Sequence, residues 1–443
     1  MKNNREIPLQ SQERDPSFLR GTLIPWIICL LAALFYFYDF FLRVTPSVMI
    51  HPLMDQFNVG APTIGFISAF YYYAYTPLQI PSGVIMDRYN PRWVLTLSAL
   101  LCTVGAFVFA TFLSLPAAFF GRILMGVGSA FGFIGALKLA ALWLPKKHFA
   151  LFAGIATALG TIGAVVADIL LSRVVVVLGW RQAVYLTIYV GIGLTVLLFL
   201  LIRDKPSWVV QVPRSYFSWK HTWGRVLELL KNWRFWMAGF VGCFLFLPIS
   251  VFASLWGVNF MIQAYHLPPA EGATAVALLF IGSALGFPFA GWFSDRIQNR
   301  RVPLFIGISS TFVLTLILIY VPGLPLSVAL SLLFLIGFCV GPQALIFAIA
   351  REISPPRSTG ISTAATNFIV TIGAAIFQPL IGYLLVLCWP GTQTLAGTPF
   401  YTVQNYQFAL FVLPALLFIA FLMMFAVPKT ACQKLYDQRH LTD

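Results

Sequence analysis

Apolar runs of about twenty residues recur along the whole chain, and short segments with proline, glycine or charged residues separate them. An α-helix needs roughly 20 residues to cross the hydrocarbon core of a bilayer, so each run predicts one spanning helix. In the first half the predicted spans are 22–49, 62–86, 93–112, 117–143, 149–172 and 182–202. In the second half they are 236–261, 272–293, 302–321, 325–349, 360–388 and 405–427. The pattern therefore predicts an all-α membrane protein with twelve transmembrane helices.

The composition agrees with a lipid bilayer as the main surroundings of the chain. Of the 443 residues, 59% are hydrophobic and 9% are charged, whereas soluble domains have about 45–50% apolar and about 25% charged residues. Residues 1–21 are polar and lack the apolar core and the small-residue cleavage site of a secretory signal peptide. We therefore expect them to form a retained cytoplasmic tail.

The formal net charge of +14 indicates topology rather than nucleic-acid binding, because the basic residues are spread among loops. Of the 28 Lys and Arg residues, the predicted outer loops hold only Arg173 and Arg181. Arg43, Arg122 and Lys138 fall inside predicted helices, and the others fall on the opposite side of the membrane. Cytoplasmic loops carry an excess of Lys and Arg, so both termini are expected in the cytoplasm, with the chain in a bacterial inner membrane.

One long polar segment, rich in basic residues and tryptophan, divides the chain into two halves with equal numbers of predicted helices. Such a segment is typical of a linker at the cytoplasmic headgroups. The expected organisation is a cytoplasmic tail (1–21), a six-helix bundle (22–202), a basic cytoplasmic linker (203–235), a second six-helix bundle (236–427) and a cytoplasmic tail (428–443).

The two halves repeat short sequence patterns at equivalent positions. A segment from Gly83 to Arg88 lies at the end of the second predicted helix, and Gly291 to Arg296 lies at the end of its counterpart with the same Gly, Asp and Arg spacing. An Ile-Gly-Ala sequence leads to Asp168 in the first half and to Gln378 in the second. A duplicated six-helix unit is how many secondary transporters are built, with the solute site between the halves near mid-membrane.

These patterns resemble the major facilitator superfamily of membrane transporters, which implies two pseudo-symmetric six-helix bundles and no enzymatic activity. The duplicated segment is similar to the cytoplasmic loop motif of that family, although Asn-Pro at positions 90 and 91 replaces the usual Gly-Arg core. A carboxylate at this place can close one side of the carrier by pairing with a helix N-terminus or with basic residues; the alternative is ordinary anchoring of the loop. The expected gating residues are Gly83, Asp87, Arg88, Arg92, Gly291, Asp295 and Arg296.

Ionisable residues inside lipid-spanning helices are costly and by default mark transport pathways. Asp39 and Arg43 are four residues apart, so they share one helical face and lie within reach of each other. With the neighbouring Tyr36 they resemble the helix-one site of the organic-anion symporters of the superfamily, where Asp and Arg are adjacent. The alternative is a self-neutralising pair near the outer interface.

Arg122, with glycines at 126 and 128, resembles the helix-four motif of the same family. The anion symporters commonly carry a second acid seven residues later, where this chain has Ser129. Asp39 alone, or Asp168 in its place, is then the expected proton carrier, and a carrier without proton coupling is the alternative. Asp168 also lies close in sequence to Arg173, with which it could simply pair. Lys138 follows Arg122 by sixteen residues, on nearly the opposite face of a straight helix, so it faces the same cavity only if the helix bends; otherwise it extends to the cytoplasm.

Polar side chains in other predicted helices complete the expected solute site. Each of them could instead serve helix packing, which is the commoner fate of a single intramembrane polar residue. The full set of expected solute-binding residues is Tyr36, Arg43, Tyr72, Tyr75, Arg122, Lys138, Asn259, Gln343, Asn367 and Gln378.

The expected function is secondary active transport by alternating access, as a proton-coupled symporter. Basic residues outnumber acids among the intramembrane charges, so an anionic or zwitterionic, carboxylate-bearing organic solute is expected. Passive facilitation and a transport-dead membrane sensor are the alternatives. Expected partners are the solute, protons and lipid, with a monomeric chain and no nucleic acid. The six cysteines show no paired spacing, and we expect neither a metal site nor a cofactor.

Overall fold

The structure is a computed structural model, and it describes residues 23–203, 224, 226–229, 231–354, 359–394 and 397–426. The predicted tails 1–21 and 428–443 lie outside the described residues, as do positions 204–223 of the predicted linker. In the part of the chain that is described, the secondary structure is helical apart from one isolated β-bridge between Gln393 and Pro399.

The amino-terminal half contains six spanning units, several of them interrupted by short irregular turns. Its elements are α1 (Ile24–Val44), η2 (Thr45–Val48), α2 (Ile50–Phe57), α3 (Ala61–Arg88), α4 (Pro91–Thr111), α5 (Leu115–Ser129), α6 (Gly132–Trp143), α7 (Lys146–Val166), η3 (Ala167–Leu171), α8 (Ser172–Leu178) and α9 (Trp180–Leu201).

The carboxy-terminal half repeats this plan. Its elements are α11 (Trp233–Leu247), η5 (Pro248–Trp256), α12 (Gly257–Tyr265), α13 (Pro269–Ile297), α14 (Arg301–Tyr320), α15 (Leu326–Val340), η6 (Gly341–Ala344), α16 (Leu345–Glu352), α17 (Thr359–Leu387), α18 (Val403–Leu410) and α19 (Val412–Met423).

Among the described residues, 11 helical units are long and apolar enough to cross a membrane. The remaining long helix is α3, which has 28 residues. Polar side chains lower its hydropathy, and three of them, Tyr72, Thr76 and Gln79, are buried inside the protein. Together with α3 these units give the twelve helices that the apolar runs predict, and the predicted fold of two six-helix bundles is confirmed.

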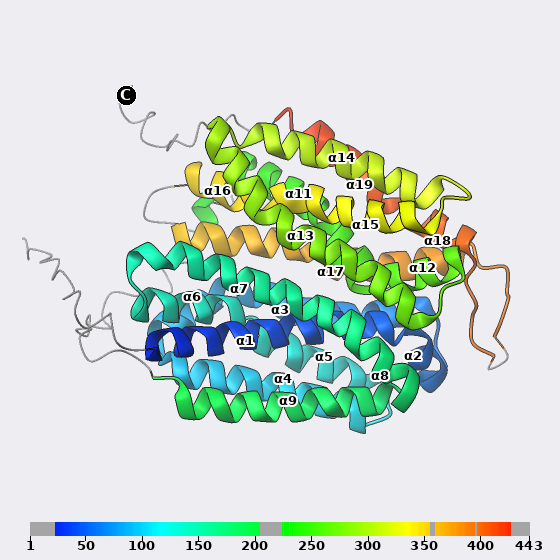
Figure 1. Cartoon of the computed structure of the whole chain (residues 1–443), viewed down its shortest axis with the longest axis horizontal. Coiled ribbons are helices and arrows are strands. Elements are labelled where there is room, and N and C mark those ends of the chain that lie inside the picture. The colour runs from blue at the N-terminus through cyan, green and yellow to red at the C-terminus, as the bar shows by residue number, and fades with distance from the viewer. Residues whose placement is uncertain are drawn as a thin grey trace, which may run out of the picture.

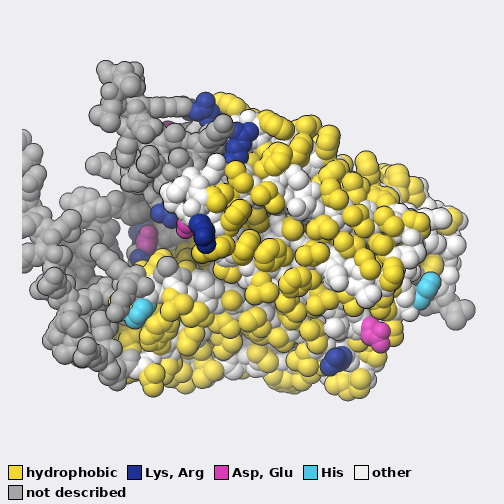
Figure 2. All heavy atoms as spheres, turned by 45° about the horizontal axis from the view of Figure 1, so that its top comes forward, with side chains coloured by type: hydrophobic (Ala, Val, Ile, Leu, Met, Phe, Trp, Pro, Cys, Tyr) yellow, Lys and Arg dark blue, Asp and Glu magenta, His cyan; other side chains and the backbone are white. Residues whose placement is uncertain are grey.

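The two bundles lie side by side, with their helices along the long axis of the molecule (Figure 1). We call the end at which α1 begins the proximal end, on the left of Figure 1, and the opposite end, which carries α2, the distal end. Hydrophobic side chains cover most of the visible flank, whereas the visible charged side chains lie toward the two ends (Figure 2). This distribution fits a flank that faces lipid.

Prolines interrupt the first spanning helix of each half. Pro46 lies in η2, directly after α1, and Pro248 begins η5 in the equivalent helix of the second half. Because proline has no backbone N–H, it removes one helical hydrogen bond and favours a local change of helix type. The apolar run predicted as one helix over 22–49 is therefore α-helical only to Val44 and continues as the 3-10 turn η2 to Val48.

The halves meet mainly where α3 packs along α17 and where α7 and η3 pack against α13. Toward the distal end the α3–α17 contact is close enough to need glycine: a Cβ at Gly65 would lie 2.7 Å from the Pro379 Cα, and one at Gly382 would lie 2.6 Å from the Ala61 carbonyl oxygen. The backbone N–H of Ala61 also donates to the Tyr401 hydroxyl at 3.2 Å. These contacts across the halves close the distal end.

A short helix that the sequence pattern does not predict reinforces this closure. α2 is amphipathic and turns Ile50, Leu53 and Met54 inward. From its other side, Asp55 Oδ1 accepts a hydrogen bond of 2.8 Å from the Thr398 hydroxyl, which belongs to the connection between α17 and α18. The α17–α18 connection of the carboxy-terminal half is thereby hydrogen-bonded to α2 of the amino-terminal half.

Candidate functional site

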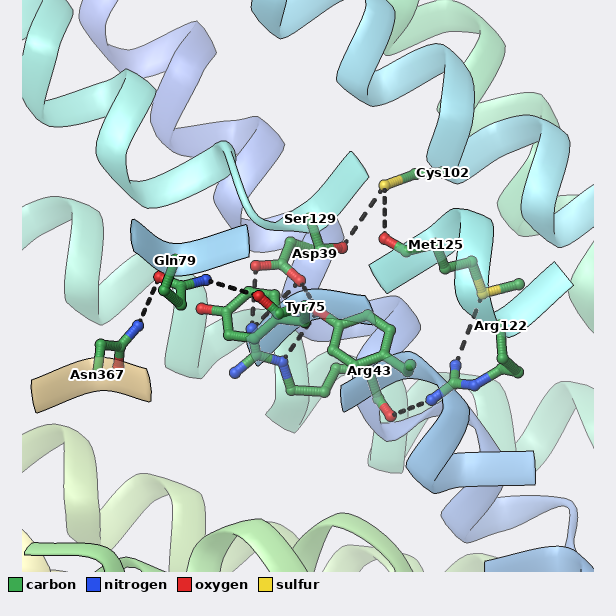
Figure 3. A network of polar contacts seen from close by, with 10 residues as sticks. Asp39, Arg43, Tyr75, Gln79, Cys102, Arg122, Met125, Ser129 and Asn367 are labelled. Carbon is green, nitrogen blue, oxygen red and sulfur yellow. Dashed lines mark hydrogen bonds and ion pairs between the residues drawn. The ribbon is translucent and has the colours of Figure 1, made fainter. Parts of the chain in front are cut away.

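Asp39 and Arg43 form a buried ion pair in the last two turns of α1. Arg43 Nη2 lies 3.2 Å from Asp39 Oδ2, and Arg43 Nε donates to the Tyr71 hydroxyl at 3.2 Å. The Tyr71 hydroxyl in turn donates a short hydrogen bond to Asp39 Oδ1. Asp39 is 0% exposed, so the three groups satisfy one another with no help from solvent. Figure 3 shows Asp39 and Arg43 at the centre of the polar network.

Aromatic rings surround the Arg43 guanidinium. Its carbon lies 4.2 Å from the ring centre of Phe40, 4.7 Å from that of Tyr75 and 5.9 Å from that of Tyr72. Arginine is attracted to aromatic faces at such distances because the ring faces carry negative charge. Tyr36 does not reach the guanidinium but packs edge-on against Phe40, with ring centres 5.0 Å apart. We call Phe40, Tyr71, Tyr72 and Tyr75 the aromatic cage.

Ser129, at the end of α5, lies near the Asp39 carboxylate. Its hydroxyl lies 3.5 Å from Cys102 Sγ on α4 (Figure 3). The residue that stands in place of a second acid is therefore a neighbour of the first acid. A hydroxyl at this place can donate a hydrogen bond to Asp39 but cannot carry a proton between the two sides of the membrane.

Arg122 on α5 is buried and donates hydrogen bonds to backbone carbonyl oxygens rather than to a carboxylate. Its Nη1 lies 2.9 Å from the Leu42 oxygen, and its Nε lies 3.2 Å from the Ile67 oxygen. A third bond, 3.3 Å long, goes from Nη2 to the Arg43 oxygen. In the described part of the chain no carboxylate forms an ion pair with Arg122. The guanidinium therefore fixes the end of α1 that carries Asp39 and Arg43.

An amide pair joins the two halves beside the aromatic cage. Asn367 Nδ2 on α17 donates to Gln79 Oε1 on α3 at 2.7 Å, and Gln79 Nε2 donates to the Tyr75 carbonyl oxygen at 3.4 Å (Figure 3). One turn away, the hydroxyls of Thr76 and Thr371 lie 3.1 Å apart. Polar groups of both halves thus meet within one turn of Tyr75.

Other expected residues of the second half lie in separate hydrogen-bonding positions. Gln378 Nε2 donates to the Ser250 carbonyl oxygen at 2.8 Å, and its Oε1 is buried without a partner among the described residues. Asn259 is buried, and its Nδ2 has no hydrogen-bond partner within the described part of the chain. Gln343 is buried in η6. The hydrogen bonds and ion pairs of these residues do not join them to Arg43 in this conformation.

Asp168 lies in η3, away from the ion pair, and is 0% exposed. Its Oδ1 accepts a hydrogen bond of 3.0 Å from the Ser47 hydroxyl of η2, and its Oδ2 has no partner among the described residues. Arg173, the neighbour with which it could have paired, is exposed and forms no ion pair with a described carboxylate.

Lys138 lies far from the aromatic cage. The turn between α5 and α6 interrupts the helix, and Lys138 Nζ reaches Asp87 Oδ1 at 2.5 Å near the proximal end of α3. Both side chains are partly exposed, at 30% and 57%. Of the two placements considered for Lys138, the structure therefore has the one outside the solute site, and in this conformation Lys138 belongs with the loop motif.

The remaining loop-motif residues also make their contacts within their own half. Arg300 bridges Asp295 at 3.2 Å and Glu352 at 2.6 Å. Arg92 Nε donates to the Phe199 carbonyl oxygen at 2.7 Å, and the guanidinium groups of Arg88 and Arg296 lie over the neighbouring rings of Tyr89 and Trp292. A Cβ at either glycine of the motif, Gly83 or Gly291, would meet nothing within 4 Å.

Several residues at the site were not predicted from the sequence. Tyr71 belongs to the tyrosine cluster of α3. It is four residues from Tyr75, so both lie on one helical face, and this spacing would have identified Tyr71 as a site residue. Gln79 is a polar residue in an apolar stretch and could have been found in the same way. Ser47, which bonds Asp168 from 121 positions away, left no signal in the sequence.

Comparison with known proteins agrees with this architecture. The sequence profile of the Major Facilitator Superfamily matches residues 29–378. The "Probable hexose phosphate transport protein" of Chlamydia pneumoniae is 23% identical over 79% of this chain and 83% of its own length. The "Membrane sensor protein UhpC" of Escherichia coli is 22% identical over 81% of this chain and 85% of its own length. The "Probable galactarate/D-glucarate transporter GudP" of the same species is 20% identical over 81% and 86%.

Solved structures share the fold. A bacterial homologue of the human lysosomal transporter Spinster superposes with a TM-score of 0.77 at 16% identity, over 94% of this chain and 99% of the other. A D-xylose–proton symporter superposes with a TM-score of 0.71 at 14% identity, over 93% and 100%. With a family profile that matches well over half of its residues, this chain belongs to the Major Facilitator Superfamily and is a multi-pass membrane transport protein, not an enzyme.

Proposed function

We propose that this chain is a secondary active transporter that moves a small organic anion together with protons by alternating access. The observation that carries the proposal is the buried ion pair of Asp39 and Arg43, which is completed by the Tyr71 hydroxyl. A charge pair in a transmembrane helix is costly to bury, and it is typical of solute and ion pathways. Its place in the aromatic cage, beside the amide pair of the two halves, suits a site that both halves contact.

The coupling follows from charge balance at Arg43. While Asp39 is ionised, its carboxylate takes up the hydrogen-bond donors of the Arg43 guanidinium, so an anionic solute cannot bind there. When Asp39 takes up a proton, the pair loses its attraction, and the carboxylate or phosphate of a solute can replace Asp39 with a comparable hydrogen-bonding geometry. One proton and one anion are then bound together, and the internal ion pair re-forms once both have been released.

Polar groups around the cage favour a hydroxylated anion. Tyr75, Gln79 and Asn367 offer hydroxyl and amide groups to the hydroxyls of a solute, while Arg43 binds its charged end. Relatives named as carriers of hexose phosphate and of galactarate/D-glucarate support an anionic, hydroxylated class. Tyr36, Asn259, Gln343 and Gln378 remain expected solute contacts in other conformations, and Arg122 acts through the backbone of α1.

We propose that the chain lies in a bacterial inner membrane with its proximal end facing the cytoplasm. Both termini are proposed to lie on that side. The chain is proposed to act as a monomer. The excess of Lys and Arg in the proximal loops supports this orientation. At that end, the ion pair of Asp87 with Lys138 and the network around Asp295 are proposed to exchange partners when the proximal end closes.

Two alternatives have specific support. Ser129 in place of a second acid favours passive facilitation of the same anion, because one carboxylate fewer is available to carry protons. Similarity to a membrane sensor protein favours a chain that binds the anion without moving it.

A reconstitution experiment separates the three functions. The purified chain is first screened by thermal shift against hexose phosphates, galactarate, glucarate and the neutral parent hexoses. Proteoliposomes then report uptake of the stabilising anion with and without an inward proton gradient. Symport predicts uphill accumulation that a protonophore abolishes; a facilitator equilibrates the anion without accumulation, and a sensor binds it without flux. Equal stabilisation by a neutral hexose would contradict the anionic class.

A further inference from the structure

We propose that Asp168 is a proton-binding site of the distal end: its carboxyl group holds a proton while this end is closed and releases it to water when the end opens. The inference goes beyond the proposed function, because it requires neither the solute nor the Asp39–Arg43 pair. According to this proposal, closing the distal end binds one proton, separately from the proton on Asp39.

The surroundings of Asp168 fit a neutral carboxyl group and not a carboxylate. The residue is 0% exposed, and its one hydrogen bond comes from the Ser47 hydroxyl at 3.0 Å. Its second oxygen, Oδ2, has no partner among the described residues. A buried carboxylate needs a cation or several donors to compensate for its lost hydration, whereas an uncharged carboxyl with one unmade hydrogen bond is far less costly.

No charged group on the neighbouring elements compensates an ionised Asp168. On α8, Arg173 is exposed. On α13, Glu271 is exposed, and Asp295 and Arg296 belong to the last turn, at the proximal end. On α1, Arg43 is already paired with Asp39. η2 has the sequence Thr-Pro-Ser-Val and carries no charge, and the basic residues of α7 belong to its proximal start. Among the described residues, the closed distal end therefore offers Asp168 no counter-ion.

The position of Asp168 links its hydration to the movement of the halves. η3, which carries it, packs against α13 of the opposite half and against η2, and η2 itself packs against η5 of that half. These are the contacts that must separate when the distal end opens. Separation exposes η3 to water, which stabilises the ionised carboxylate. Closing the end again requires a proton, because burial of the bare charge would oppose closure.

The irregular backbone at this place fits such a role. η3 is a π-helical turn inserted between α7 and α8. π-helical turns are rare in proteins overall, but those that occur often lie at functional sites, because the extra residue changes the direction of the side chains that follow. Here the turn holds Asp168 at the contact with η2 and α13.

Distance measurements between spin labels test this proposal in the absence of solute. Labels are placed on the distal ends of the two halves, at Val177 on α8, which is 78% exposed, and at Val321 after α14, which is 45% exposed. In nanodiscs both faces experience the same pH. For one coupled proton, the closed-to-open ratio of the parent chain should fall by up to about tenfold per pH unit as the pH rises. Cys339 and Cys388, the cysteines of the described residues that are not buried, are replaced by serine, and Cys432 is replaced in the same way.

Three variants assign the pH response to Asp168. Asp168→Asn is uncharged at every pH and should give the closed distance distribution throughout. Glu271→Gln, which alters an exposed acid of α13, should keep the parental pH response, and Ser47→Ala should keep a pH response because the titrating group remains. A parental response in Asp168→Asn, a pH-insensitive parent chain, or a response to sodium ions in place of pH would overturn the proposal. None of these results depends on whether the chain transports an anion.

Discussion

Arg122 Nη1 donates a hydrogen bond of 2.9 Å to the Leu42 carbonyl oxygen. In a regular helix the backbone N–H of residue 46 would serve this oxygen, but Pro46 has none. The side chain of α5 thus supplies the hydrogen bond that proline removes from α1. Because Asp39 and Arg43 lie in the same last turns of α1, their positions depend on Arg122.

Arg122→Lys should therefore impair transport although it keeps the charge. Lysine presents one compact ammonium and cannot reach the three carbonyl oxygens that the guanidinium fork serves. An unsatisfied buried carbonyl costs about 1–3 kcal/mol, so solute exchange should fall by about tenfold or more and the melting temperature should drop. Arg173→Lys, at an exposed position of α8, is the matched control. Parental exchange and stability in Arg122→Lys would contradict this role.

The amide pair across the halves gives a second prediction. Gln79→Ala and Asn367→Ala should each raise the KM for solute by roughly 5- to 30-fold, because each leaves the other amide without its partner and removes a solute contact, at a cost of about 1–2 kcal/mol. The double variant should lose less than the sum of the two, since the hydrogen bond of 2.7 Å joins the pair. Strictly additive losses would show that the two amides act independently of each other.

The pairing of Lys138 with Asp87 predicts an effect on turnover and not on binding. Lys138→Gln should change the KM for solute by less than about twofold, because the side chain lies with the proximal loop motif. Its partial exposure limits the contribution to stability to about 1 kcal/mol or less. The exchange of the two residues, Asp87→Lys with Lys138→Asp, should recover part of the turnover that either single variant loses. A tenfold rise in KM for Lys138→Gln would contradict this prediction and would indicate that Lys138 contacts the solute.

The helices and the central pair were predictable because both depend on local sequence. The length and hydrophobicity of each apolar run are enough to predict a membrane-spanning helix. The spacing of four residues between Asp39 and Arg43 brings the two side chains together on any α-helix. The short helix α2 was missed because its apolar face is confined to 8 residues after a longer apolar run.

The rest of the site depends on contacts between helices distant in sequence. Arg122 was predicted to bind solute, but it donates to carbonyl oxygens. Two of them, Leu42 and Arg43 on α1, lie 80 and 79 positions away, and the third, Ile67, belongs to α3. The sequence left the placement of Lys138 open. A turn between α5 and α6 does interrupt the helix, yet Lys138 still reaches Asp87 near the proximal end, which only the packing of α6 against α3 decides. Asp168 could be recognised as buried, whereas its partner Ser47 could not be recognised at all.

The central claim is that Asp39 couples proton movement to anion movement. In proteoliposomes, Asp39→Asn should abolish uphill accumulation driven by a proton gradient, because an amide cannot take up and release the proton. The same variant should sustain counterflow exchange of the anion between preloaded vesicles and medium, because Arg43 is then permanently available to the solute. Uphill accumulation at the parental level by Asp39→Asn would contradict the account.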